Sequence, residues 1–233
     1  LVAPWFAPSV TFIIGASFTV SGVRALGRKL GPGVLPNLLL GRYHDPRRET
    51  RTFLFLDMKD STTHAERLGE LAFSALVRDF MHDLTDPLLA TRAEVSHYIG
   101  DEAVITWPPR TVATGDRAVD LVARFRQRLD DRRTHYESRY GVLPDFKAGG
   151  HGGPVVATEI GDLKSEIVFH GDVLNVAARV QGLAGEAGYR LLLTADVPVS
   201  DPGDALGTRS VKGRTAPVEL RGYFPADCGE SRG

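Results

Sequence analysis

The stretch from Ser96 to Pro108 reads SHYIGDEAVITWP, and the prediction of the fold starts from this pattern. Apolar runs lie on both sides of Gly100, and two acids, Asp101 and Glu102, follow the glycine directly. Such runs around a glycine predict two strands that are joined by a tight turn. The turn therefore carries two carboxylates between buried strands, and this placement needs a physical reason.

The strand that precedes this hairpin also ends in an acid. Residues 51–58, RTFLFLDM, form a compact apolar run that closes with Asp57, and a helical pattern follows. A strand–helix–strand crossover is right-handed and leaves its two strands parallel. The turn after the second strand then lies at the same end of the sheet as the end of the first. We therefore expect Asp57 and Asp101 to lie side by side.

Two carboxylates that are held so close together repel each other. A pair of divalent cations would remove the repulsion, and two metals about 4 Å apart can clamp the attacking and leaving oxygens of a phosphoryl transfer. The simpler interpretation is that both acids merely end strands in solvent, as an aspartate at a turn usually does. The convergence of two acids by topology favours the metal site.

The other segments extend this pattern over the rest of the chain. The order of predicted elements is strand, helices, strand, strand, helix, strand, strand, helix, strand and a closing hairpin. This order predicts an α+β fold in which helices cover one face of a mainly antiparallel sheet. The glycines of residues 148–153, AGGHGG, predict close packing of another element against their strand.

Charge and cysteine content narrow the class of protein. The chain has 233 residues and a formal net charge of -1. A near-neutral charge gives no support to nucleic-acid binding, which depends on neutralising phosphates with basic residues. Cys228 is the single cysteine, so no disulfide can form within the chain, as is typical of a reducing compartment.

The first segment has a different composition from the rest. Residues 1–23 contain no charged side chain and have the length that spans a bilayer, which is about 20 residues. Basic residues follow, and such residues mark the cytoplasmic side of a membrane span. We expect a membrane helix over 1–23, a basic linker over 24–50, a cytoplasmic α+β domain over 51–225 and a tail over 226–233. A buried core helix or an interfacial helix is the alternative for the first segment.

Polar residues follow Asp57 at the start of the predicted helix. Backbone N–H groups at a helix N-terminus can bind phosphate oxygens. A simple N-terminal cap by a serine or threonine side chain is the alternative, and both can hold together. The residues in question are Lys59, Asp60, Ser61 and Thr62.

A second polar group lies on the helix that VLNVAARVQGLA predicts. Asn175 and Arg179 are four residues apart and therefore share a face of this helix. An amide and a guanidinium on an otherwise apolar helix suggest an anionic ligand. A surface arginine with a capping asparagine is the alternative. Lys212 offers another cation beside the glycine turn of the closing hairpin.

Four motifs occur in one order along the chain: FLFLDMKDST, HYIGDEAVITWP, FKAGGHGG and EIVFHGDVLNVAARVQ. Together they resemble the catalytic domain of the class III nucleotidyl cyclases, the family of adenylate and guanylate cyclases, over about residues 51–224. LLLGRYHDPRRE is similar to the segment that joins a membrane anchor to the cyclase domain in bacterial members. The resemblance implies a ferredoxin-like core, similar to a polymerase palm, with a transmembrane helix before it.

The resemblance also implies an activity and a set of site residues. The activity is that of an adenylate cyclase, which converts ATP to 3′,5′-cyclic AMP and pyrophosphate in a homodimer with shared active sites. Asp57 and Asp101, with the backbone carbonyl of Met58, would hold two Mg²⁺ or Mn²⁺ ions. Asn175 and Arg179 would reach into the site of the partner chain, where they orient the ribose and stabilise the transition state. Lys212 would grip the triphosphate, and from the helix N-terminus we expect further phosphate contacts at Lys59, Asp60, Ser61 and Thr62.

Two positions depart from the family pattern. The family reads the purine with a lysine four residues before the second metal aspartate, and with Asp, Thr or Ser seven residues before the asparagine. These positions hold His97 and Val168 here. A neutral imidazole can still bond to a purine edge, backbone groups can read the base beside Val168, or the site can be loose about its base. His97 can also be a strand residue that faces away from the nucleotide.

These departures leave other functions open. One is a guanylate cyclase or a cyclase of another nucleotide, and one is a catalytically silent domain that binds a nucleotide or a partner and regulates. A metal-dependent nucleotidyl transferase or nuclease is a further alternative, and the near-neutral charge argues against long nucleic-acid substrates. The enzyme is favoured because Asp57, Asp101, Asn175 and Arg179 are all present.

Overall fold

The computed structural model describes residues 6–30, 43–107, 114–161, 165–210 and 217–225. The chain divides into two compact units, Leu1–Asp45 and Pro46–Gly233. The described part of the first unit contains helix α1, Phe6–Leu30. The second unit holds the strands and helices that the motifs predict.

Helix α1 covers most of the segment that was expected to span a membrane. It exposes large apolar side chains at Phe12, Ile13 and Phe18. Polar residues interrupt its apolar run, and the hydroxyl of Thr19 donates to the backbone carbonyl of Gly15 at 2.9 Å. Within the described ranges, no helix has both the length and the apolar character that a bilayer crossing requires. The predicted span over 1–23 is therefore not confirmed, and α1 continues into the predicted linker as far as Leu30.

The second unit is built on one sheet. Its eight described strands include seven in the order β2-β3-β1-β4-β6-β8-β7, and β5 pairs with β4 beside this path. The strand pairs are antiparallel except for β4 with β6, so the mainly antiparallel sheet is confirmed. The first strand starts earlier than the predicted domain boundary at residue 51. The strands are β1 Arg47–Met58, β2 Glu94–Ile99, β3 Glu102–Thr106, β4 Phe146–Ile160, β5 Glu166–His170, β6 Tyr189–Thr194, β7 Asp204–Arg209 and β8 Val218–Pro225.

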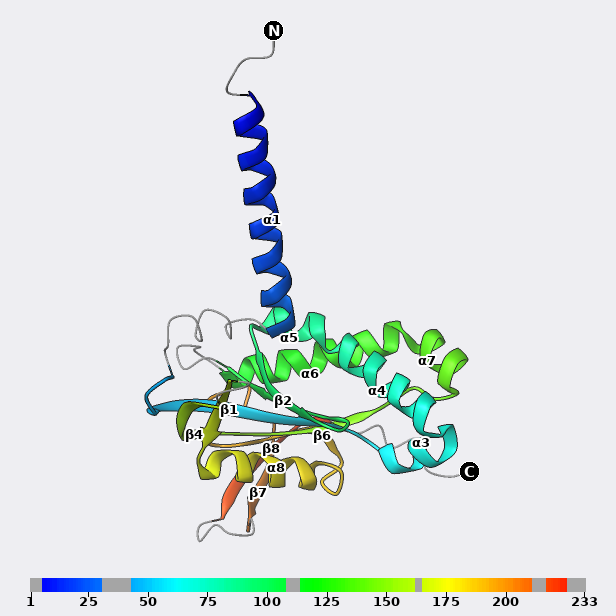
Figure 1. The fold of residues 1–233 in the computed structure, drawn as a ribbon. Coiled ribbons are helices and arrows are strands. Elements are labelled where there is room, and N and C mark those ends of the chain that lie inside the picture. The colour runs from blue at the N-terminus through cyan, green and yellow to red at the C-terminus, as the bar shows by residue number, and fades with distance from the viewer. Residues whose placement is uncertain (1–5, 31–42, 108–113, 162–164, 211–216, 226–233) are drawn as a thin grey trace. The chain divides into compact units, whose positions relative to one another are not determined.

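Helices cover both faces of this sheet, whereas the sequence predicted one covered face (Figure 1). Successive side chains of a strand point to opposite faces. In β1, Leu54 and Leu56 pack into a core with helices α4 to α7, while Phe53 and Phe55 pack with helix α8 on the other face. The helices are α3 Ser61–Leu68, α4 Glu70–Asp83, α5 Thr85–Thr91, α6 Thr114–Asp131, α7 Arg133–Tyr140 and α8 Asp172–Ala184.

Helix α8 lies in direct backbone contact with β4. A Cβ atom at Gly149 would lie 2.0 Å from the backbone nitrogen of Gln181, and one at Gly153 would lie 2.8 Å from a methyl group of Val173. Only glycine can occupy position 149 at this separation, because the atom that a side chain would meet belongs to the helix backbone. The close packing predicted from AGGHGG is therefore confirmed.

Replacing Gly149 with alanine should destabilise the second unit, because the new methyl group overlaps the α8 backbone. Overpacking typically costs about 1–3 kcal/mol, and we expect at least that loss in the free energy of unfolding. Gly182→Ala is the matched control, since a Cβ there meets no described atom within 4 Å. Its stability should equal that of the wild type or exceed it by up to about 1 kcal/mol. Denaturant unfolding followed by circular dichroism measures both, and a Gly149→Ala chain of wild-type stability contradicts the packing.

Candidate active site

Three carboxylates meet at the end of β1. In the antiparallel register of β1 and β3, Asp57 lies opposite Glu102, and Asp101 precedes Glu102 in the turn. The structure thus brings Asp57 and Asp101 together, as the crossover rule predicts, although β3 lies between β1 and β2 in the sheet. Glu102 is the direct cross-strand neighbour of Asp57, a role that the strand pattern alone did not assign to it.

This cluster holds more negative charge than the chain neutralises. Burial, followed by the charge of Asp101, raises the pKa of Asp57. Burial, with the charges of Asp57 and Asp101, raises the pKa of Glu102 from 4.5 to about 7. Lys147 compensates in part, because its Nζ lies 3.5 Å from Oδ2 of Asp57. The electrostatic environment therefore favours a cation beside these groups.

The donor set fits a divalent cation that also binds a phosphate. Oδ2 of Asp101 is buried and has no hydrogen-bond partner among the described residues, which is costly for a carboxylate. Magnesium is commonly held by one or two carboxylates together with substrate phosphates. In the described part of the chain, no three His, Cys, Asp or Glu side chains are arranged to hold a metal by themselves, so substrate oxygens would have to complete the coordination. The side chain of Met58 is only 2% exposed in the core, which leaves its backbone carbonyl as the group that could contribute.

Helix α8 reaches this cluster through one glutamine. Nε2 of Gln181 donates to Oδ2 of Asp57 at 3.1 Å, and Gln181 is buried. Arg179 and Asn175 lie on a different side of the helix, because positions 179 and 181 are roughly 200° apart at 3.6 residues per turn. Nη1 of Arg179 is buried without a hydrogen-bond partner in the described ranges, and Asn175 is exposed. Within one chain, the two predicted catalytic residues thus do not share the side of α8 that contacts Asp57.

Lys59 has a structural partner that the sequence did not indicate. Its Nζ lies 2.9 Å from Oδ2 of Asp145, and Nε of Arg190 donates to Oδ1 of the same carboxylate at 2.9 Å. Burial would raise the pKa of Asp145, but these hydrogen bonds outweigh it and lower the pKa. In this structure the ammonium of Lys59 forms an ion pair that ties the end of β1 to the start of β4, and its predicted contact with a triphosphate stays a prediction.

The start of α3 also differs from the simple capping alternative. The helix begins at Ser61, and its N-cap residue is Asp60, which adopts a left-handed conformation with φ 54°. No side chain caps this end, so the capping role considered for Ser61 or Thr62 is wrong. The first-turn N–H groups of α3 instead follow directly after the carboxylate cluster along the chain, and their predicted role in phosphate binding stays a prediction.

His97 lies on the same face of the sheet as Asp57. It pairs with Val104, and Val104 pairs with Phe55, two residues before Asp57. Antiparallel partners share a face, so His97 lies on the Asp57 face of the sheet beyond the register shift between Val95 and His97, and its contact with a base stays a prediction. Burial lowers the pKa of His97, while the charge of Glu166 opposes the change.

The other predicted base-reading residue, Val168, lies in β5 opposite Thr158 and is half-buried. Glu166 precedes it by two residues and therefore shares its face of β5. The charge of Glu166 reaches His97, so the structure brings the β2 and β5 positions into electrostatic range of each other. Lys212 lies outside the described residues.

Three residues of the cluster were not predicted as site residues: Glu102, Lys147 and Gln181. All three lie inside motifs that carry the family resemblance, next to residues that were singled out. Gln181 had a detectable signal, because it is a polar residue on the apolar stripe of an amphipathic helix. Lys147 and Glu102 become neighbours of Asp57 only through the strand register.

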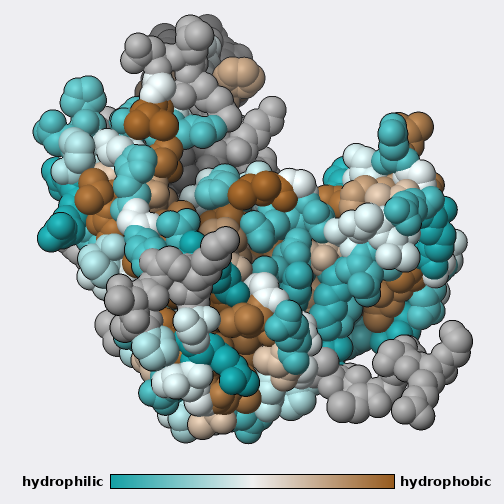
Figure 2. Space-filling model, turned by 90° about the horizontal axis from the view of Figure 1, so that it is seen from below, coloured by the Kyte–Doolittle hydropathy of each residue, from teal (hydrophilic) through white to brown (hydrophobic). Residues whose placement is uncertain are grey.

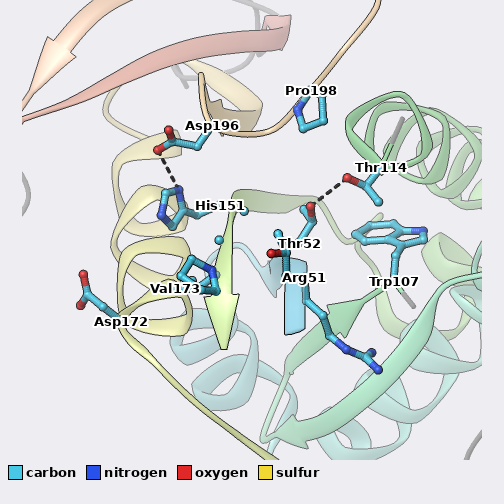
Figure 3. A pocket seen from close by; sticks show the side chains of 13 residues that line it. Arg51, Thr52, Trp107, Thr114, His151, Asp172, Val173, Asp196 and Pro198 are labelled. Carbon is cyan, nitrogen blue, oxygen red and sulfur yellow. Dashed lines mark hydrogen bonds and ion pairs between the residues drawn. The ribbon is translucent and has the colours of Figure 1, made fainter. Parts of the chain in front are cut away.

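A separate pocket of about 620 Å³ lies along the first half of β1. There Nδ1 of His151 lies 3.6 Å from Oδ2 of Asp196, and the hydroxyls of Thr52 and Thr114 lie 2.8 Å apart (Figure 3). Thr52 is five residues from Asp57, which is roughly 16 Å along an extended strand. This pocket is therefore distinct from the carboxylate cluster, and the described residues predicted for the site do not line it.

Comparisons with known proteins agree with the resemblance. The chain is 33% identical to "Adenylate cyclase 2" of Rhizobium meliloti (strain 1021) over 211 residues, which are 88% of this chain and 58% of that protein. A bacterial light-regulated adenylyl cyclase superposes with a TM-score of 0.72 and 20% identity, over 97% of this chain and 68% of that one. The guanylyl cyclase Cya2 superposes with a TM-score of 0.63 and 18% identity, over 76% of this chain and 92% of that one. No model of a protein family matches the chain.

These likenesses establish the fold of the second unit. It has the class III cyclase catalytic-domain fold, which adenylyl and guanylyl cyclases share. The chain spans less than two thirds of the length of the curated relative.

Without divalent cations, the melting temperature of the chain should fall as the pH rises from about 5 to 8. The folded state binds more protons than the unfolded state while Glu102 titrates, since folding raises its pKa from 4.5 to about 7. The contribution of Glu102 to the stability is therefore fully present below about pH 4.5 and is lost as the pH rises through about 7. The raised pKa of Asp57 acts in the same direction. Glu102→Gln should weaken the pH dependence and raise the melting temperature at pH 8.

The matched control for this experiment is Glu219→Gln, which removes an exposed carboxylate on β8. Differential scanning fluorimetry over this pH range compares the three chains. Glu102→Gln and Glu219→Gln should differ in slope, and equal slopes would contradict the electrostatic account of the cluster.

Proposed function

We propose that the chain belongs to the class III nucleotidyl cyclases and acts as an adenylate cyclase, which converts ATP to 3′,5′-cyclic AMP and pyrophosphate. The fold, the similarity to an adenylate cyclase of Rhizobium meliloti and the carboxylate cluster support this proposal. Asp57, Asp101, Asn175 and Arg179 match the residues that the family uses for metal binding and for the transition state.

The orientation of α8 is the observation that carries the proposal. The helix directs Gln181 to Asp57 of its own chain, whereas Asn175 and Arg179 lie on another side. A site that needs both sets of residues is incomplete in one chain. A head-to-tail pair of chains completes it, because the Arg179 side of one α8 then lies against the carboxylates of the other chain.

The surface around the cluster supports such a pair. Tyr98 and Ile99, at the end of β2 beside Asp101, are 53% and 55% exposed. Figure 2 views the molecule from the α8 side, where apolar patches are interspersed among polar ones. Large apolar side chains next to half-buried carboxylates favour a surface that a second chain covers.

In this site the chain binds and orients the nucleotide. Asp57 and Asp101 would hold divalent cations, which lower the pKa of the ribose 3′-hydroxyl and neutralise the triphosphate. Asn175 would orient the ribose so that its 3′-oxygen faces the α-phosphorus, with pyrophosphate as the leaving group. Arg179 would offset the negative charge that grows on the α-phosphate in the transition state, where such binding accelerates the reaction.

The base is the least constrained part of this proposal. His97 lies on the site face and is a hydrogen-bonding group, but Val168 offers no polar side chain. Position 168 has no side-chain donor or acceptor with which to discriminate one purine from the other. A guanylate cyclase is therefore the second candidate, and the adenylate cyclase is preferred because of the similarity to adenylate cyclase 2 of Rhizobium meliloti. A silent nucleotide-binding domain is less favoured, since the matched catalytic residues are present.

Two inactive variants should restore activity when they are mixed. Asp57→Ala and Arg179→Ala should each lower kcat by at least about 100-fold, as the loss of one charge-stabilising group does. If equal amounts mix at random, about half of the dimers are heterodimers. Each heterodimer has one intact site of two, so about a quarter of the wild-type activity should return. Cyclic AMP formation measures the activity, and size-exclusion chromatography with light scattering confirms that dimers form.

The control mixes Asp57→Ala with Asp101→Ala, which belong to the same half of the site. This pair should stay inactive, because every composite site then lacks one carboxylate. Dimers of the first pair that regain nothing would show that the active site is not shared between chains.

A further inference from the structure

Gln181 makes a contact that the proposed reaction does not explain by itself. Its side-chain amide comes from α8 and donates to the carboxylate that ends β1, 124 residues earlier in the chain. Gln181 is 6% exposed, so this amide is almost entirely removed from water. Burying an amide costs roughly 1–3 kcal/mol unless it finds a hydrogen-bond partner, so an apolar residue would pack more cheaply here. The amide is therefore better explained by what it does to Asp57.

The contact fixes one oxygen of the carboxylate. Nε2 of Gln181 lies 3.1 Å from Oδ2 of Asp57, and Nζ of Lys147 lies 3.5 Å from the same atom. Both hydrogen bonds favour the ionised form and act against the burial that raises the pKa of Asp57. With Oδ2 held from two directions, the carboxylate cannot rotate freely, and Oδ1, which carries neither contact, has a set direction.

The backbone of α8 makes this reach possible. At Gln181 this backbone comes so near β4 that its nitrogen would lie 2.0 Å from a Cβ at Gly149. Gly149 lies two residues after Lys147 in β4, and Lys147 pairs with Asp57 across the strands. Gly149 therefore allows α8 to lie close to the sheet. At this separation the side chain of Gln181 is long enough to reach Asp57 at the end of β1.

We infer that Gln181 is a positioning residue, which orients the Asp57 carboxylate for metal binding in its own chain. The inference rests on the proposed function for the reaction, but the contact itself lies within one chain. It gives α8 two tasks, because Arg179, two residues earlier, would serve the site that is built on the partner's carboxylates. Each α8 helix then supports both active sites of the dimer, one through Gln181 and the other through Arg179.

A placement experiment separates this role from a general effect on the helix. In a mixture of Asp57→Ala and Arg179→Ala chains, the intact site takes its Asp57 from the Arg179→Ala chain. Adding Gln181→Met to that chain should lower the restored activity about tenfold, the lower end of what outer partners of metal ligands contribute. Adding Gln181→Met to the Asp57→Ala chain should leave the restored activity within about twofold of the parent mixture. Position 181 of that chain faces the site that has already lost Asp57 and is inactive.

Metal affinity provides a readout that is independent of turnover. The homodimer is titrated with Mn²⁺ alone, and free Mn²⁺ is followed by electron paramagnetic resonance. Gln181→Met should raise the dissociation constant about tenfold. Gln127→Met is the matched control, since Gln127 also donates from a helix to an aspartate, Asp131, at 2.8 Å, but on the exposed side of α6. This control should bind Mn²⁺ as the wild type does.

The outcomes distinguish the two ideas. Equal losses from both placements of Gln181→Met, or unchanged Mn²⁺ affinity in a chain with wild-type melting temperature, would overturn the positioning role. If Gln181→Met lowers the melting temperature, Gln181→Asn replaces it, since the shorter amide stays polar but falls short of Oδ2 of Asp57 and should also weaken Mn²⁺ binding. If the parent mixture regains no activity while dimers form, the shared-site proposal fails, and the Mn²⁺ titration alone decides the role of Gln181.

Discussion

The backbone contact between α8 and β4 at Gly149 is the constraint on which the candidate site depends. A Cβ atom there would lie 2.0 Å from the backbone of α8, so the helix can rest at this height only on glycine. From this position Gln181 reaches the carboxylate of Asp57 at 3.1 Å. The helix period then places Arg179 on another side, where it cannot serve the same carboxylate. Close packing in one chain thus leads to a site that two chains would complete.

The same site opposes the stability of the isolated chain. Asp57, Asp101 and Glu102 crowd together at the end of β1, and their mutual repulsion and burial raise the pKa of Asp57 and Glu102. Within the described residues, a buried oxygen of Asp101 and a buried nitrogen of Arg179 have no hydrogen-bond partner. Such uncompensated groups are costly in a monomer and useful where charge is brought by a ligand. The proposed dimer, with metal and nucleotide bound, would supply partners for both.

Much of the fold followed from residue patterns, and the failures have physical causes. The crossover rule placed Asp57 beside Asp101, because it depends only on the order and handedness of elements. The prediction that helices cover one face of the sheet was wrong, since helical periodicity shows which side of a helix is apolar but not which sheet face receives it. The Lys59–Asp145 ion pair joins residues 86 positions apart, and no local pattern indicates such a contact. The membrane span was inferred from length and absence of charge, and it was not confirmed in the described residues.

The identity of the reaction product tests the account most directly. The purified chain is incubated with Mn²⁺ and, separately, with ATP, GTP, CTP and UTP, and the products are identified by mass spectrometry. We expect 3′,5′-cyclic AMP and pyrophosphate from ATP, with His97 and its surroundings selecting the base. A cyclic product from GTP in place of ATP would contradict the proposed substrate and leave the fold and metal site intact. Nucleotide binding without any cyclic product would contradict the enzyme itself and favour a regulatory domain.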